Sequence, residues 1–167
     1  MYAKLNYGLK RLFKRGVLQF ASNAWFINYR IRNLLYKFVG IDIGKRCFIG
    51  RNVYFDELNL QGIHIGNHVT ITMGCAILSH FLNTETGSFE LGEVFIGDDV
   101  FIGMNSIIAK PVVIGKDTVV GAGSIVTRNL PQGVIAGGNP AKVIKPKAST
   151  KLAYDTDYIG GGVTSGL

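Results

Sequence analysis

A period of six residues dominates the middle of the chain. Its longest uninterrupted series of aliphatic residues and their followers is Ile96-Gly97, Ile102-Gly103, Ile108-Ala109, Ile114-Gly115, Val120-Gly121 and Val126-Thr127. An earlier series starts at Ile43-Gly44 and contains one slip of four residues, between Phe55 and Ile65. A period of six fits neither the 3.6-residue turn of an α-helix nor the two-residue alternation of a strand. It indicates a repeat architecture instead.

Each unit of six is expected to form a short strand and a corner, and three units close a triangular coil of about eighteen residues. The aliphatic residue points inward, and the glycine that follows it lets the corner take a positive φ. The fifth residue of a unit is small or β-branched and packs inside near the bend. Cys47 and Cys75 hold two of these interior positions, so both are expected to be buried free thiols. The fold class predicted is all-β, a parallel β-helix of about five stacked coils.

The repeat resembles that of the left-handed β-helix acyltransferases over roughly residues 41–147. The segment from Ile114 to Thr127 and the ending Gly138-Asn139-Pro140-Ala141-Lys142 are similar to those of the galactoside, maltose, xenobiotic and polysaccharide O-acetyltransferases. The resemblance implies a left-handed coil and a homotrimer whose active sites lie between neighbouring subunits. It also implies acetyl-CoA as the acyl donor and no required metal.

The period fails over residues 79–93, a segment that is expected to project from one corner as a loop. His80 stands where this loop leaves the coil. Acetyl transfer to a hydroxyl needs a base that works near neutral pH, and an imidazole meets that need. A histidine at this loop entry deprotonates the acceptor in the acetyltransferases that the repeat resembles. The resemblance therefore makes His80 the general base, and a purely structural histidine is the alternative.

The resemblance also assigns residues to the acyl donor. The backbone of Met104 is placed beside the thioester carbonyl, where an N–H would meet the oxyanion. The Ala122 amide and the region of Thr127 are assigned to the pantetheine arm and the nucleotide. Lys142 and Lys145 fall on the basic positions near the phosphates. The alternative is that the small residues of this set are corners of the coil and nothing more.

Carboxylates from two parts of the sequence are candidates for binding the acceptor. Asp56 ends a stretch that resembles one in which the family has a substrate-contacting asparagine, so it would bind a sugar hydroxyl or orient His80. A solvated corner carboxylate is the alternative for Asp56. Glu85 lies in the loop and would face a polyol, with Glu90 and Glu93 of the same segment as alternatives that the sequence does not rank. The acceptor expected is a sugar or polysaccharide hydroxyl; an antibiotic, serine or an amino sugar that becomes N-acetylated stays open, as does a non-catalytic scaffold.

Three histidines raise the rival class of zinc carbonic anhydrases, which share this fold. The spacing of His64 and His68 does not resemble the ligand pattern of that family, and the coenzyme A type of ending would go unexplained. His64 and His68 flank the corner at Ile65-Gly66 and are therefore expected to be structural and to face solvent.

The N-terminal segment, residues 1–40, carries eight Lys and Arg residues and no acidic residue. Two series of apolar residues at helical spacing predict two short helices that meet at Gly16, the second ending at Gly40. The series are Leu5, Leu9, Leu12 and Phe13, and then Ile27, Ile31, Leu34, Leu35 and Phe38. A helical cap on the domain is expected, with a basic surface that rests on anionic lipid or a lipid-linked substrate as the alternative. No nucleic-acid-binding module accompanies the charge.

The sequence therefore predicts three regions: a basic helical cap over residues 1–40, the β-helix acetyltransferase domain over 41–147, and a C-terminal tail over 148–167. The chain has no secretory signal pattern and no apolar run of the roughly 18 residues that a membrane span needs. A cytoplasmic location is expected, with peripheral membrane association as the variant that the basic segment suggests.

Overall fold

Three sheets form the walls of a triangular coil in the computed structural model, which describes residues 2–148 and their side chains from residue 12 onward. Sheet A contains β1 (Asp42–Ile43), β4 (Ile63–Ile65), β9 (Val94–Ile96) and β12 (Val113–Ile114). Sheet B contains β2 (Phe48–Ile49), β5 (Thr70–Ile71), β10 (Phe101–Ile102), β13 (Val119–Val120), β15 (Val134–Gly138) and β16 (Ala141–Pro146). Sheet C contains β3 (Tyr54–Phe55), β6 (Ala76–Ile77), β11 (Ile107–Ile108) and β14 (Ile125–Val126).

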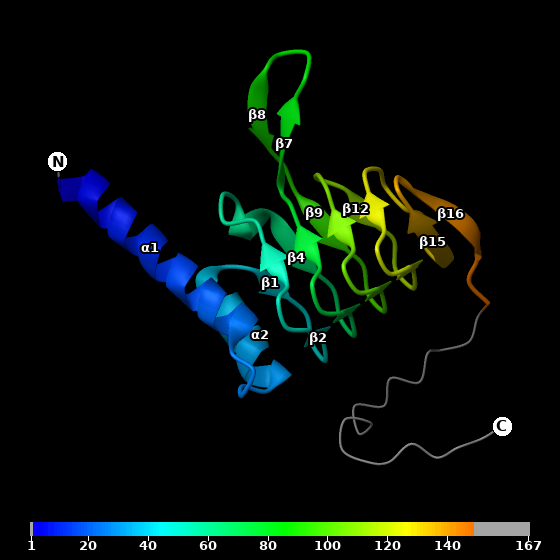
Figure 1. Cartoon of the computed structure of the whole chain (residues 1–167), viewed down its shortest axis with the longest axis horizontal. Coiled ribbons are helices and arrows are strands. Elements are labelled where there is room, and N and C mark those ends of the chain that lie inside the picture. Colours follow the sequence, from blue (N-terminus) through cyan, green and yellow to red (C-terminus); the bar gives the residue numbers. More distant parts are fainter. Residues whose placement is uncertain (1, 149–167) are drawn as a thin grey trace.

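The chain visits sheets A, B and C in turn and so makes four complete coils before β15 begins a partial fifth. Neighbouring strands are parallel in all three sheets except in the closing hairpin of β15 and β16, which is antiparallel. The predicted left-handed parallel β-helix is confirmed. Figure 1 shows the coils stacked side by side, with the N-terminal helices at the β1 end of the stack and β16 at the other.

The inward columns of aliphatic side chains form the core, as the period of six predicts. Ile49, Ile71, Ile102 and Val120 stand one above another on sheet B and are fully buried. The prediction for the cysteines is also confirmed, since Cys47 and Cys75 are buried free thiols. Their thiols contact carbonyl oxygens of the next coil, and burial raises the pKa of each.

The glycine after each aliphatic residue has a different role from the one predicted. Positive φ falls two residues later, at positions such as Asn52 and Asn105. The glycine is needed because the next coil passes too close for a side chain. A Cβ on Gly103 would lie 2.4 Å from the amide nitrogen of Ala122. The short distance between neighbouring coils therefore requires this glycine. The corner position with positive φ is occupied by asparagine, aspartate and other residues.

The N-terminal segment forms α1 (Tyr2–Asn23) and α2 (Tyr29–Val39). The break predicted at Gly16 is wrong, because α1 runs through it and ends at Asn23. A single helical glycine costs only about 1 kcal/mol, which the packing of α1 on the coil outweighs. The stop at Gly40 is confirmed, since Gly40 caps α2 with a φ of 112° and donates its N–H to the last turn.

The face of α2 that packs on the coil differs from the predicted apolar stripe. Leu35 of that stripe packs against the core, but Ile31, Leu34 and Phe38 are exposed, whereas Arg32 and Tyr36 are buried. The Arg32 guanidinium donates to the carbonyl oxygens of Ala21, Ile49, Ala24 and Ile27 at 2.8, 3.2, 3.1 and 3.5 Å, which ties the end of α1 to the first coil. These backbone acceptors make a buried arginine favourable. The spacing of apolar residues in the sequence does not reveal such acceptors.

The insertion over residues 79–93 is a β-hairpin rather than an irregular loop. It consists of β7 (His80–Asn83) and β8 (Ser88–Leu91), paired antiparallel from His80 opposite Leu91 to Asn83 opposite Ser88. Figure 1 shows it projecting away from the coil stack. At its base the Asn59 side chain donates to the Gly92 carbonyl at 2.9 Å, just before the 3-10 turn η1 (Leu60–Gly62) that occupies the slip in the period.

Of the tail predicted for residues 148–167, all but residue 148 lies outside the described residues. Neither of the described helices has the combination of length and apolar character that crossing a bilayer demands.

Candidate active site

His80 and Asp56 meet at the corner between sheets C and A. Strands β3 and β6 pair with Phe55 opposite Ile77, so the chain leaves both coils at the same corner. Asp56 follows β3 directly, and His80 begins the hairpin two residues after Leu78. The register brings His80 Nδ1 to 2.5 Å from Asp56 Oδ2, across 24 residues of sequence.

The Asp56 carboxylate is enclosed by the protein, with 1% of its side chain exposed. Besides His80, it accepts hydrogen bonds from the Ser79 amide at 2.9 Å, the Ser79 hydroxyl at 3.1 Å and the Leu58 amide at 3.1 Å. Burial opposes ionisation, but the hydrogen bonds from His80, Leu58 and Ser79 outweigh it and hold the pKa of Asp56 below its usual value. The alternative of a solvated corner carboxylate is therefore wrong.

An ionised Asp56 determines which nitrogen of His80 can act as a base. A carboxylate only accepts hydrogen bonds, so Nδ1 of a neutral His80 carries the proton and Nε2 keeps its lone pair. No described residue forms a hydrogen bond with Nε2, and 23% of the His80 side chain is exposed. The Phe89 ring of β8 lies beside the imidazole, with ring centres 5.9 Å apart. The pair thus presents a fixed basic nitrogen at the base of the hairpin.

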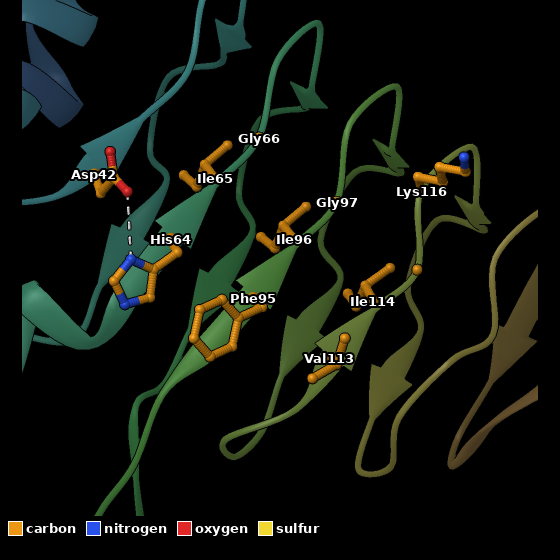
Figure 2. A pocket seen from close by; sticks show the side chains of 11 residues that line it. Asp42, His64, Ile65, Gly66, Phe95, Ile96, Gly97, Val113, Ile114 and Lys116 are labelled. Atoms are coloured by element: carbon orange, nitrogen blue, oxygen red, sulfur yellow. Dashed lines mark hydrogen bonds and ion pairs between the residues drawn. The ribbon is translucent and has the colours of Figure 1, made fainter.

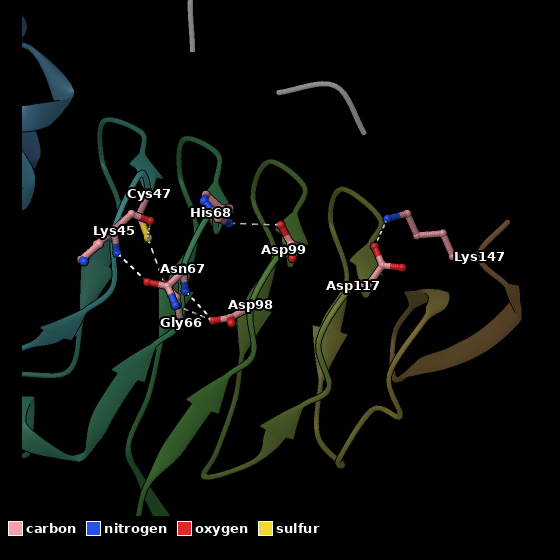
Figure 3. A network of polar contacts seen from close by, with 9 residues as sticks. All are labelled: Lys45, Cys47, Gly66, Asn67, His68, Asp98, Asp99, Asp117 and Lys147. Atoms are coloured by element: carbon pink, nitrogen blue, oxygen red, sulfur yellow. Dashed lines mark hydrogen bonds and ion pairs between the residues drawn. The ribbon is translucent and has the colours of Figure 1, made fainter. Parts of the chain in front are cut away.

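Met104 and Ala122 lie at a second corner, between sheets B and C, on successive coils. Neither backbone N–H has a hydrogen-bond partner among the described residues. At the corner between sheets A and B, Figure 3 shows two amides that are bonded: Asn67 Oδ1 accepts from the Lys45 amide, and Asp98 Oδ1 accepts from the Asn67 amide. The Asp98 and Lys116 amides at that corner have no partner among the described residues either. The Met104 and Ala122 amides, about 4.8 Å apart along the stack, are therefore available to a ligand.

One chain does not bring all the candidate residues together. Thr127 follows β14 and lies in the same corner column as Asp56, on the His80 side of sheet C, whereas Met104 and Ala122 lie on its far side. Lys142 and Lys145 are exposed on β16, at the end of the stack away from the helices. Glu85 is exposed at the tip of the hairpin, beyond Asn83, so it is separated from His80 by the length of β7.

The outer face of sheet A has a pocket of about 420 Å³ that was not predicted from the sequence. Figure 2 shows Asp42, His64, Phe95 and Val113 in one row across the four strands. The His64 ring stacks on Phe95 with ring centres 4.6 Å apart, and its Nδ1 lies 3.4 Å from Asp42 Oδ2. Each of these residues directly precedes a buried aliphatic residue. The period of six therefore predicts that all four lie on the outer face of the same sheet.

His64 therefore lies on a strand rather than at a solvated corner. His68 does lie at a corner, with positive φ and its Nδ1 3.4 Å from Asp99. Among the described residues, no three His, Cys, Asp or Glu side chains gather where they could hold a metal ion.

Comparisons with known proteins agree with this geometry. Two models of hexapeptide-repeat transferases match: the bacterial transferase hexapeptide (six repeats) over residues 93–128, and the hexapeptide repeat of succinyl-transferase over residues 40–79. Protein CapG of Staphylococcus aureus is 42% identical over 131 residues, which are 72% of this chain and 75% of CapG.

Two solved structures are similar to most of the chain. A maltose O-acetyltransferase from Clostridium difficile 630 is 25% identical, with a TM-score of 0.67 over 84% of this chain and 87% of that one. A galactoside acetyltransferase in complex with coenzyme A is also 25% identical, with a TM-score of 0.63 over 90% of this chain and 84% of that one.

The fold and these similarities define a hexapeptide-repeat acyltransferase. The chain belongs to the hexapeptide-repeat transferase family and is an acetyltransferase that uses acetyl-CoA, which sets aside the non-catalytic scaffold.

Proposed function

We propose that this enzyme transfers the acetyl group of acetyl-CoA to a hydroxyl of a sugar or polysaccharide, with His80 as the general base. The observation that carries the proposal is the 2.5 Å contact between His80 Nδ1 and the buried Asp56 carboxylate, which leaves Nε2 as a basic nitrogen facing outward. Similarity to a maltose O-acetyltransferase and a galactoside acetyltransferase supports a sugar as the acceptor.

In the proposed reaction, His80 Nε2 takes the proton of the acceptor hydroxyl while that oxygen attacks the carbonyl carbon of the thioester. The Met104 amide donates to the oxygen that becomes negative, and the Ala122 amide binds the pantetheine arm. Asp56 stabilises the imidazolium while it exists. His80 then returns the proton to the departing sulfur as the C–S bond breaks, which gives an acetyl ester and free coenzyme A. Lys142 and Lys145 meet the phosphates of the donor.

We also propose that the active site is completed by a second subunit of a homotrimer. The support is the separation described above: His80 and the Met104 and Ala122 amides lie at opposite edges of sheet C. If sheet C faces the threefold axis, the His80 corner of one subunit adjoins the Met104 corner of the next. Each groove between subunits then holds one complete set of residues.

Subunit mixing tests the shared site. His80→Ala removes the base, and Ala122→Trp fills the donor groove from an exposed position. Each variant alone is expected to be inactive. Random reassembly of an equal mixture should restore about a quarter of the wild-type sites, since base and donor positions then come independently from two chains. No restoration in a mixture shown to contain hybrid trimers would contradict a site built from two subunits.

The acceptor is tested with a panel of simple sugars, polysaccharide repeat units, amino sugars, serine and aminoglycoside antibiotics. Release of the coenzyme A thiol identifies the acceptor, and the product is characterised by mass and by its lability in alkali. The proposal predicts an alkali-labile ester on a sugar hydroxyl. An alkali-stable amide on an amino sugar would contradict O-acetylation and favour N-acetylation.

A further inference from the structure

The two N-terminal helices leave a continuous apolar face exposed on the side away from the coil. Leu18 and Ala21 of α1 are buried against the coil, whereas Phe13 and Phe20, seven residues apart and so on one side of the helix, are exposed. The Phe13 ring packs edge-on against Phe38 of α2 at 6.3 Å, and the Phe20 ring against Phe26 at 6.1 Å. The first contact joins α1 to α2, and the second joins α1 to the segment between the two helices.

We call this surface the outer helical face and define it by Phe13, Phe20, Trp25, Phe26, Leu34 and Phe38. Each of these side chains is about half exposed or more, and Trp25, the only tryptophan in the chain, is 78% exposed. A monomeric surface rarely presents large aromatic side chains together without a ligand or partner to cover them. An occupant is therefore required, and the charge around the face indicates which kind.

The charge around the outer helical face has one sign. Residues 1–41 contain eight Lys and Arg residues and no Asp or Glu. Arg32 is buried in the fold and Arg15 pairs with Glu57 of the first coil, so neither contributes a free charge at the surface. Arg30 and Lys37 are exposed on α2, which also carries Leu34 and Phe38. Apolar and aromatic side chains flanked by cations are typical of helices that lie in the interface of an anionic bilayer.

We propose that the outer helical face binds the surface of an anionic membrane, with Trp25 and its aromatic neighbours entering the headgroup region. A second copy of this chain is a poorer occupant, because it would bring two sets of unopposed cations together. An anionic surface instead attracts them. The helices cover the β1 end of the coil stack (Figure 1), so in the proposed trimer all three faces lie at the same end and can bind together. The last point rests on the proposed trimer.

Trp25 supplies a built-in probe of this binding. The full-length protein is titrated with vesicles of phosphatidylcholine, and with vesicles that contain about 30% phosphatidylglycerol as well. The emission of the single tryptophan should shift to the blue with the anionic vesicles only, and brominated lipid should quench it. Raising the salt concentration should weaken the binding. An unchanged spectrum with the anionic vesicles, or equal binding to both kinds, would overturn the proposal.

Co-sedimentation with the same vesicles tests individual residues. Leu34→Ser removes an exposed apolar side chain and should weaken binding about tenfold or more. The double variant Arg30→Gln/Lys37→Gln should weaken binding to anionic vesicles by about tenfold. Leu82→Ser, at a half-exposed position on the hairpin, is the matched control and should bind as the wild type does.

Activity and assembly are measured on the same variants. Leu34→Ser should keep wild-type acetyl transfer to a soluble acceptor and the wild-type mass in light scattering, so a loss of lipid binding is separable from any failure of the proposed reaction. If Leu34→Ser changes the assembly state while vesicle binding stays as in the wild type, the outer helical face is an interface between copies and the lipid proposal is wrong.

Discussion

Replacing Asp56 by asparagine is expected to lower kcat while the fold and donor binding are kept. The change is nearly isosteric, but the amide has one acceptor oxygen where the carboxylate uses two, so it can accept from Ser79 or from Leu58 and not from both. What it removes is the negative charge beside His80. That charge matters most when His80 holds the acceptor proton, since the imidazolium and the carboxylate then attract each other.

The size of the effect follows from the geometry of the pair. The Nδ1–Oδ2 distance of 2.5 Å puts the two charge centres roughly 4 Å apart, and at an effective dielectric constant of about 20 their attraction is about 4 kcal/mol. Because each 1.36 kcal/mol of barrier is a factor of ten, loss of this attraction should reduce kcat by about 10²–10³. An asparagine that turns its NH₂ toward His80 would also favour the wrong tautomer, which acts in the same direction.

The assay is steady-state release of the coenzyme A thiol with a saturating acceptor, with the affinity for coenzyme A measured separately by calorimetry. Asp99→Asn is a matched control. It makes the same substitution in the pair of His68 and Asp99, whose side chains are 3.4 Å apart at an exposed corner. The control should change kcat by less than about twofold, because a solvated pair contributes little.

Two results would refute this reasoning. One is a kcat for Asp56→Asn within about threefold of the wild type, since it would mean that the buried charge does not act through His80. The other is a double variant Asp56→Asn/His80→Ala much slower than His80→Ala alone. If Asp56 acts only through His80, its replacement should cost nothing further once the imidazole is gone.

Three further predictions concern stability. The lowered pKa of Asp56 stabilises the fold above the ordinary carboxyl pKa, and this contribution is lost as pH falls through the native pKa. In urea unfolding between about pH 5 and pH 2, the free energy of unfolding should therefore fall less for Asp56→Asn than for the wild type. Arg32→Met should lower the free energy of unfolding by about 3 kcal/mol, because it leaves buried carbonyl oxygens without a donor, and an equal stability of the two proteins would contradict the role given to the guanidinium. Gly16→Ala should raise the free energy of unfolding by about 0.5–1 kcal/mol, and with it the melting temperature, because a Cβ there meets nothing within 4 Å. Gly103→Ala should lower the melting temperature, because its Cβ would lie 2.4 Å from the Ala122 nitrogen.

The coil was predictable because a strictly repeated pattern of six residues determines the register of its strands. Each leading aliphatic from Ile96 to Val126 is buried, and the two cysteines fill the interior positions that the pattern assigned to them. The break in the pattern also marked the segment that leaves the coil, a hairpin that begins at His80. Asp56 was identified as well, but the sequence left open whether it was solvated, since only the pairing of β3 with β6 brings it within hydrogen-bond distance of a residue 24 positions away.

The helices were less predictable because their packing depends on partners outside the helix. Ile31, Leu34 and Phe38 form a regular apolar stripe, yet the coil packs against Arg32 and Tyr36. The buried Arg32 is stable only because the end of α1 and the first coil offer carbonyl oxygens in the right places. No local pattern encodes that arrangement. The aromatic residues that α1 and α2 leave outside are the basis of the proposed lipid contact.

The most direct test of the proposed chemistry compares acetyl transfer by the wild type and by His80→Ala, with coenzyme A affinity and assembly state measured on the same preparations. His80→Ala should bind coenzyme A as tightly as the wild type and keep its assembly state, and it should lose about 10³-fold or more in kcat because the proton has no acceptor. If His80→Ala keeps more than about a tenth of wild-type turnover, His80 is not the base and the proposed mechanism is wrong.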